Sequence, residues 1–313
     1  MKKLWRTIIC TEFALCITLL PQGCSTVGDI PAVATPTSIP ALGPEASQAS
    51  TPVATSAQAS TSPPPSTPAA TPLPTLPMEE AKRFARELFR TNRGCLLPCW
   101  WGFWPGETSW LEAKSFLEPF AYLNPEVDQT KPKFTIGILV PVPEEVFPIP
   151  LSHVYRVENG VITSMEIKVG GQIPEYTLSA FLNTYGSPGE IWLSTYSTEY
   201  PAGVLPFQVV LFYPERGILA VYGPKNAQIV DDKVIGCQLD NSAWKFGLWS
   251  PKMAMTFMEA AVRFRMNPYE PGVLHLPIEE ATDMDVRSFY ETYRHADSHV
   301  CIETPRALWP EQQ

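Results

Sequence analysis

The chain lacks any recognisable catalytic or cofactor motif. Among its 313 residues there is no Gly-x-Ser-x-Gly nucleophile turn, no phosphate-binding glycine loop and no dinucleotide fingerprint. Glu and Asp are plentiful, but no pair of carboxylates is distinguished by its spacing or by a familiar sequence frame. The sequence therefore predicts no reaction and no cofactor, and we expect a protein that is not an enzyme.

Clustered positive charge is also missing. The net charge is −9, and no run of five or more basic residues occurs. Proteins that bind DNA or RNA use clustered Lys and Arg to neutralise phosphates, and docking onto anionic lipid needs a polybasic segment. The sequence predicts no nucleic-acid partner, so any membrane attachment must have another source.

A secretory signal stands at the N-terminus. Three positive charges among the first six residues precede an apolar stretch over residues 7–20, long enough for a signal peptide and too short to span a bilayer. Glu12 interrupts this stretch, and a carboxylate is costly in an apolar insertion segment. The pattern predicts an export signal within residues 1–24.

Cys24 closes the signal in a setting that resembles the lipobox of bacterial lipoproteins. In that motif a small residue precedes a cysteine that is diacylated and becomes the mature N-terminus. Gly23 fits the pattern, whereas Pro21 and Gln22 depart from it. The resemblance implies an exported protein anchored by lipid on Cys24 at the cell membrane or cell surface. The alternative is an ordinary secretory signal, or an uncleaved anchor, with Cys24 incidental.

Residues 25–77 have the composition of a linker. They contain twelve prolines and many Ser, Thr and Ala, no aromatic residue, and only Asp29 and Glu45 as charged residues. Such a segment buries too little apolar surface to offset the entropy of the chain. As a flexible coil it would reach roughly 40 Å. The composition predicts a disordered tether between the anchor and a folded part.

The folded part is expected over residues 78–313, either as one domain or as subdomains 78–225 and 226–313. That length is enough to bury a sizeable core. It contains an even number of cysteines, which in an exported domain indicates two disulfides. The four are Cys95, Cys99, Cys237 and Cys301. Of three pairings we favour Cys95–Cys99, since Leu-Leu-Pro between them forms turns, together with Cys237–Cys301.

Helical and extended patterns alternate along the folded part. Helices are expected over residues 77–92, from Pro105-Gly106 to Pro119, and over 176–185, 253–264 and 285–294; strands are expected over 134–140, 153–157, 161–169, 190–195, 207–213, 217–222 and 228–238. Asn159-Gly160 is a strong hairpin signal. A helix followed by antiparallel strands, twice, predicts the α+β class. We expect antiparallel sheets with helices on one face, two helix–hairpin units and a helical C-terminal part.

This recurrence resembles two groups of proteins. Pro-Gly-x-Thr at 105–108 and Tyr-Gly-x-Pro at 185–188 lie in a region, about 105–222, that is similar to outer-membrane small-lipoprotein and β-lactamase-inhibitor-like repeats. Those repeats bind other proteins and catalyse nothing. Cys-Leu-Leu-Pro-Cys-Trp-Trp-Gly at 95–102, followed by Pro-Gly-Glu-Thr, more closely resembles uncharacterised exported bacterial lipoproteins. The resemblances imply a fold and a location, and no reaction.

Large aromatic residues crowd the segment after the second of these cysteines. They are Trp100, Trp101, Phe103, Trp104 and Trp110. Stacked aromatics form sugar-binding platforms and exposed ones anchor protein partners; the other interpretation is that they pack over the disulfide as core. Alternation along an extended segment would turn about two of the first four inward. We take Trp100, Trp101 and Trp104 as candidate binding residues, and expect Trp101 or Trp104 to be exposed.

His295-x-x-x-His299, followed by Cys301 and Glu303, has residues that can ligate a metal. Ala-Asp-Ser between the histidines indicates a helix end, so the two rings should diverge, and Cys301 is expected in a disulfide. No metal site is predicted.

These observations favour a non-catalytic, surface-tethered lipoprotein whose domain binds an envelope protein or a glycan. The alternative is an exported hydrolase acting on cell-wall or extracellular polymer. A cleft lined by two facing carboxylates would favour the enzyme, and an exposed aromatic patch would favour the binding protein.

Overall fold

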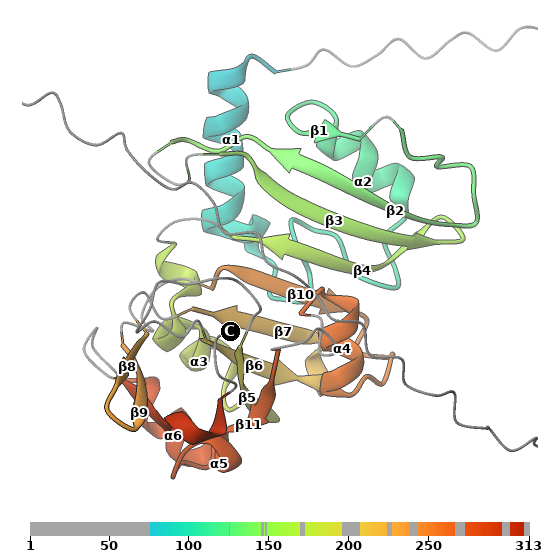
Figure 1. Cartoon of the computed structure of the whole chain (residues 1–313). Helices are drawn as coiled ribbons and strands as arrows, with labels where there is room; N and C mark the ends of the chain where they lie inside the picture. The colour runs from blue at the N-terminus through green and yellow to red at the C-terminus, as the bar shows by residue number, and fades with distance from the viewer. Residues whose placement is uncertain are drawn as a thin grey trace, which may run out of the picture. The chain divides into compact units, whose positions relative to one another are not determined.

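The computed structural model describes residues 76–124, 126–144, 147, 149–169, 173–195, 207–223, 227–237, 243–266, 273–295 and 301–309. These residues form helices and a large antiparallel sheet, which confirms the α+β class (Figure 1). The expected signal, Cys24 and the linker as far as residue 75 lie outside them. Within the described part, no helix has the length and apolarity needed to cross a bilayer.

A nine-stranded antiparallel sheet is the main element, with the order β1-β2-β3-β4-β10-β7-β6-β5-β11. Its strands are β1 (Tyr122–Leu123), β2 (Lys133–Val140), β3 (Leu151–Glu158), β4 (Val161–Lys168), β5 (Glu190–Thr195), β6 (Phe207–Tyr213), β7 (Ile218–Tyr222), β10 (Lys245–Trp249) and β11 (His275–Pro277). A smaller sheet has the order β12-β9-β8, formed by β8 (Gln228–Val230), β9 (Lys233–Gly236) and β12 (Ile302–Pro305). Asn159 and Gly160, both with positive φ, join β3 to β4 as the predicted hairpin turn.

The central strand β10 is absent from the sequence prediction. It pairs with β4 on one side and with β7 on the other. It therefore joins β1 to β4 with β5, β6, β7 and β11 in one sheet. The strand is only five residues long and has Gly247 at its centre, which weakens its sequence signal. That glycine is required because a Cβ there would overlap the ring of Phe264.

Five of the helices in the described part overlap segments that were predicted to be helical, and α5 was not predicted. The helices are α1 (Met78–Thr91), α2 (Trp110–Leu117), α3 (Leu178–Tyr185), α4 (Phe257–Arg263), α5 (Ile278–Ala281) and α6 (Val286–Tyr293), with short 3₁₀ turns at Asn92–Gly94, Pro174–Tyr176, Pro214–Arg216 and Arg306–Leu308. Ser109 caps α2, since its side chain accepts the N–H of Glu112 at 3.2 Å. The helix expected from residue 253 begins at 257 because Thr256 and Glu259 form a capping box there.

Helices cover both faces of the sheet, so the expectation of helices on one face is wrong. Buried residues of α1, α2, α3, α5 and α6 belong to a core on one face, whereas α4 packs on the other face against β6, β7 and β10. The reason is visible in β6, where Val209 and Leu211 point to the first core and Val210 and Phe212 to the second. A strand that is apolar on both faces needs cover on both.

The C-terminal part is also less helical than expected. Beyond residue 226 it contains β8 to β12 as well as α4 to α6. The single edge strand expected over 228–238 is a hairpin of β8 and β9, with Asp231 at positive φ in its turn. A two-residue turn without glycine gives little sequence signal, which explains the difference.

Candidate functional site

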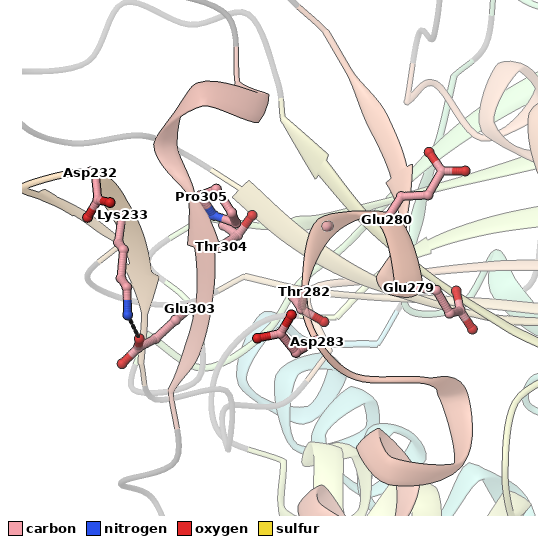
Figure 2. A pocket seen from close by; sticks show the side chains of 10 residues that line it. Asp232, Lys233, Glu279, Glu280, Thr282, Asp283, Glu303, Thr304 and Pro305 are labelled. Carbon is pink, nitrogen blue, oxygen red and sulfur yellow. Dashed lines mark hydrogen bonds and ion pairs between the residues drawn. The ribbon is translucent and has the colours of Figure 1, made fainter.

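An acidic depression of about 360 Å³ lies between β9 and β12 on one side and α5 with the residues after it on the other (Figure 2). Five carboxylates line it: Asp232, Glu279, Glu280, Asp283 and Glu303. Lys233 Nζ donates to Glu303 at 2.8 Å. Carboxylates thus line both sides of the depression, but Glu279 and Glu280 point away from Glu303 (Figure 2), and all five residues are exposed to water. General acids that work at neutral pH are usually desolvated, and these five carboxylates are not.

Ser194 and His275 form a pair of the kind used by serine hydrolases. They are directly opposite on β5 and β11, and Oγ of the serine lies 2.6 Å from Nδ1 of the histidine. Ser194 is fully buried, however, and burial also lowers the pKa of His275. A hydroxyl buried in this way is not exposed to a substrate, which favours a structural role for this cross-strand pair.

The aromatic loop, residues 92–104, is organised by a buried asparagine. Asn92 follows α1 with a positive φ, and its side-chain amide donates to the carbonyls of Cys95 and Cys99 at 2.8 and 2.9 Å. Its Oδ1 accepts the N–H of Trp101 at 2.7 Å. One side chain therefore satisfies three backbone groups of the loop. The sequence prediction missed this residue, and Asn-x-Gly at the end of a helix was the available signal.

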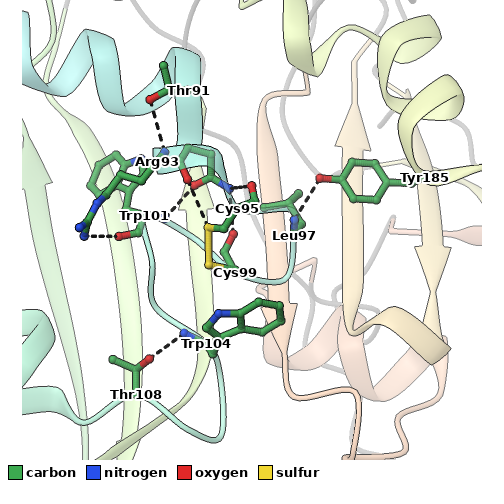
Figure 3. The surroundings of a disulfide bond; sticks show 10 residues. Thr91, Arg93, Cys95, Leu97, Cys99, Trp101, Trp104, Thr108 and Tyr185 are labelled. Carbon is green, nitrogen blue, oxygen red and sulfur yellow. Dashed lines mark hydrogen bonds between the residues drawn. A yellow bond between two sulfur atoms is a disulfide. The ribbon is translucent and has the colours of Figure 1, made fainter.

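The Cys95–Cys99 disulfide closes this loop (Figure 3), and the predicted pairing is confirmed. The two Cα atoms are 5.8 Å apart. Between the cysteines, the N–H of Leu97 donates to the hydroxyl of Tyr185 on α3 at 3.0 Å. The loop is therefore bonded to α3, the helix that precedes β5 to β7, and it also follows directly after α1.

Two of the candidate tryptophans lie in the core. Trp100 and Trp101 have no exposed surface, and their rings stack at 5.2 Å. Trp101 also contacts Phe89 edge-on at 5.3 Å and lies 5.0 Å from the ring of His153. These residues seed the core between α1 and β3 and present no surface to a partner.

The prediction that Trp100 and Trp101 form a binding surface is therefore wrong, and Trp104 is the candidate that is left. Trp104 is 43% exposed, and Leu96, in the disulfide loop, is 59% exposed. Phe103 is buried, so three of the four loop aromatics face inward rather than two. Trp101 and Gly102 both adopt positive φ, which reverses the chain and invalidates the alternation expected of an extended segment.

Polar atoms without partners accompany the buried rings. The indole nitrogens of Trp100 and Trp101, both ring nitrogens of His153 and the hydroxyl of Tyr155 make no hydrogen bond of ordinary geometry within the described part. Burial lowers the pKa of His153 to about 3, with the backbone of Lys168 opposing the shift only in part. Burial also raises the pKa of Tyr155. Both side chains are therefore neutral at pH 7.

The second disulfide, Cys237–Cys301, is also present as predicted and follows β9 on one side while preceding β12 on the other. The hydroxyl of Tyr293 donates to the carbonyl of Cys301 at 3.1 Å, which attaches α6 to the same point. His299 lies outside the described residues. Among the residues that are described, no group of three or more His, Cys, Asp or Glu could hold a metal ion.

No known protein family, no curated protein and no solved structure matches this chain.

Proposed function

We propose that this chain is an exported lipoprotein, anchored at the cell membrane or surface by lipid on Cys24, whose α+β domain is a non-catalytic module that binds an envelope protein. The observation that supports this function best is the pair of exposed apolar side chains, Leu96 and Trp104, on the aromatic loop. An exposed tryptophan is typical of the anchor points of protein interfaces.

The backbone of the loop is restrained around both residues. The disulfide and Asn92 restrain the backbone around Leu96, and the N–H of Trp104 donates to the hydroxyl of Thr108 at 2.8 Å. A restrained loop loses little conformational entropy when a partner binds. Preorganisation of this kind favours recognition over a purely structural role for the exposed residues.

A protein partner is favoured over a glycan. Glycan platforms usually present several ring faces, and Trp100 and Trp101 are buried, which leaves Trp104 as the exposed member of the three. A hydrolase is less favoured because the carboxylates of the acidic depression are exposed to water.

The order of the elements supports the likeness to small-lipoprotein and β-lactamase-inhibitor-like repeats. One helix, α2, precedes β2 to β4, and another, α3, precedes β5 to β7. We interpret these as two helix–hairpin units, and the C-x-x-x-C-W-W-G segment as the feature shared with uncharacterised exported bacterial lipoproteins.

Photo-crosslinking tests the binding surface. A photoreactive phenylalanine at position 104 of the full chain is expected to give a discrete crosslinked protein in the organism's envelope fraction. The matched control is position 111, where a leucine on α2, outside residues 92–104, is 73% exposed. The same products from both positions, or none from 104, would contradict the proposal. Crosslinking to polysaccharide would favour a glycan ligand.

The anchor gives a second prediction. Cys24→Ala in the full chain is expected to move the protein from the detergent phase to the aqueous phase in Triton X-114 partitioning, because the acyl chains supply the membrane affinity. Cys16→Ala, within the apolar stretch, is the control and should leave partitioning unchanged. Retention of the Cys24→Ala protein in the detergent phase would mean that the apolar stretch itself is the anchor.

A further inference from the structure

Four cations surround one carboxylate at the C-terminal end of α4, on the sheet face opposite Trp100 and Trp101. Arg156 lies on β3 and Lys245 on β10, and Arg263 and Arg265 lie at and just beyond the end of α4. These four residues are called the cationic cluster below. The carboxylate is Glu166 on β4, which is buried, and its Oε2 lies 3.8 Å from Nε of Arg265. The cluster is a local excess of positive charge in a chain whose net charge is −9.

Part of this positive charge stabilises the end of the helix. Nη2 of Arg156 donates to the carbonyl of Arg263, and Nζ of Lys245 donates to the carbonyl of Phe264 at 2.7 Å. A helix C-terminus carries roughly half a negative charge. One carboxylate and one helix end therefore oppose four positive charges, and a surplus of about two and a half charges remains.

The cluster also has hydrogen-bond donors to spare. Nη1 of Arg156 is buried and has no hydrogen-bond partner in the described part of the chain. Nη1 of Arg263 donates to the hydroxyl of Ser164 at 3.5 Å, at the limit of a hydrogen bond, and the side chain of Arg265 is 63% exposed. Guanidinium groups have five donors each, so within the described residues these three arginines use only part of their hydrogen-bonding capacity.

The pKa values of Lys245, which is buried, and of Arg156, which is partly buried, agree with this surplus of positive charge. Burial lowers the pKa of Lys245 to about 8, with Glu166 opposing the shift and Lys168 and Arg265 adding to it. The pKa of Arg156 is likewise lowered first by burial and, despite Glu166, further by Arg263 and Arg265. An additional negative charge at this position would relieve both effects.

We propose that the cationic cluster binds a phosphate group. Three guanidinium groups and an ammonium offer more donors than a two-oxygen carboxylate can use, whereas a phosphate has three or more acceptor oxygens and up to two negative charges. The net charge of −9 disfavours a long polyanion, so the ligand is a single phosphate group, either free or on a lipid headgroup.

Calorimetric titration of the full chain with sodium phosphate, at pH 7 and constant ionic strength, tests the site. Arg263→Gln and Arg265→Gln are each expected to weaken phosphate binding about tenfold, as loss of a charge-assisted hydrogen bond does. Both variants keep the backbone carbonyls that Arg156 and Lys245 use. Arg83→Gln, on an exposed arginine of α1, is the matched control and should bind phosphate like the parent chain.

Flotation with vesicles distinguishes the sources of phosphate. The Cys24→Ala chain is mixed with phosphatidylglycerol or phosphatidylcholine vesicles, so that the lipid anchor does not contribute. Binding to phosphatidylglycerol that Arg265→Gln abolishes and Arg83→Gln preserves would assign the site to a headgroup; binding of phosphate alone would assign it to the free ion. Absence of both, or equal losses in all three arginine variants, would overturn the proposal.

Discussion

Trp101→Ala is expected to lower the free energy of unfolding by about 3–5 kcal/mol, whereas Trp104→Ala should change it by less than about 0.5 kcal/mol. The two residues are three positions apart in the same loop, yet Trp101 is fully buried among Trp100, Phe89 and His153, and Trp104 is 43% exposed. Removal of the buried ring leaves a cavity that the surrounding rigid aromatics cannot fill.

The comparison of the two variants reports on the side chains alone, because the backbone hydrogen bonds of residues 101 and 104 do not depend on the side chain. The N–H of residue 101 donates to Asn92, and that of residue 104 to Thr108, whatever side chain they have. Urea unfolding followed by circular dichroism measures both free energies. A loss below about 1 kcal/mol for Trp101→Ala would mean that the loop is not part of the core.

Acid is expected to destabilise the protein through His153. Its pKa is about 3 in the folded protein and ordinarily 6.5, so the unfolded chain takes up a proton between these pH values that the folded protein does not. Stability is therefore full above pH 6.5 and is lost as the pH falls towards 3, by roughly 5 kcal/mol in total. Between pH 6.5 and 4.5 the loss should be about 2.5 kcal/mol.

His153→Leu should remove most of this pH dependence and leave the part that comes from His275, whose pKa is also lowered by burial. The variant buries an apolar side chain of similar size and also eliminates two buried nitrogens that lack partners, so it should fold at pH 7. His295→Gln, at an exposed histidine, is the control and should keep the parental slope. Asp128 and Glu259 have lowered pKa values, so their effect on stability appears as the pH falls below their ordinary values of 3.8 and 4.5. The change in stability above pH 4.5 therefore reports on the histidines. A slope unchanged by His153→Leu would contradict the assignment.

Signals that depend on a few neighbouring residues were readable from the sequence. Examples are the apolar spacing of α1, the Asn159-Gly160 turn and the cap at Ser109, each of which depends on residues close together in the sequence. The disulfides were also readable, because cysteines in an even set must pair and Leu-Leu-Pro constrains the shorter loop.

What could not be read depends on distant partners. Trp101 is buried because Asn92 reverses the loop through three bonds, and no alternation rule for a single segment includes such a bond. The place of β10 is set by pairing with β4 and β7, about 80 and 25 residues earlier in the chain. The cationic cluster likewise combines residues from β3, β10 and the end of α4, which show no shared pattern in the sequence.

The late position of β10 in the chain also has a consequence for folding order. When a chain emerges N-terminus first, β2 to β4 and β5 to β7 can each pair before residues 245–249 arrive. Until then β4 and β7 both present open edges, which are prone to pair with other chains. Non-local closure of this kind slows folding. A chain truncated before residue 245 would keep both edges permanently, so aggregation, more than loss of any one contact, should be the main defect of such a truncated chain.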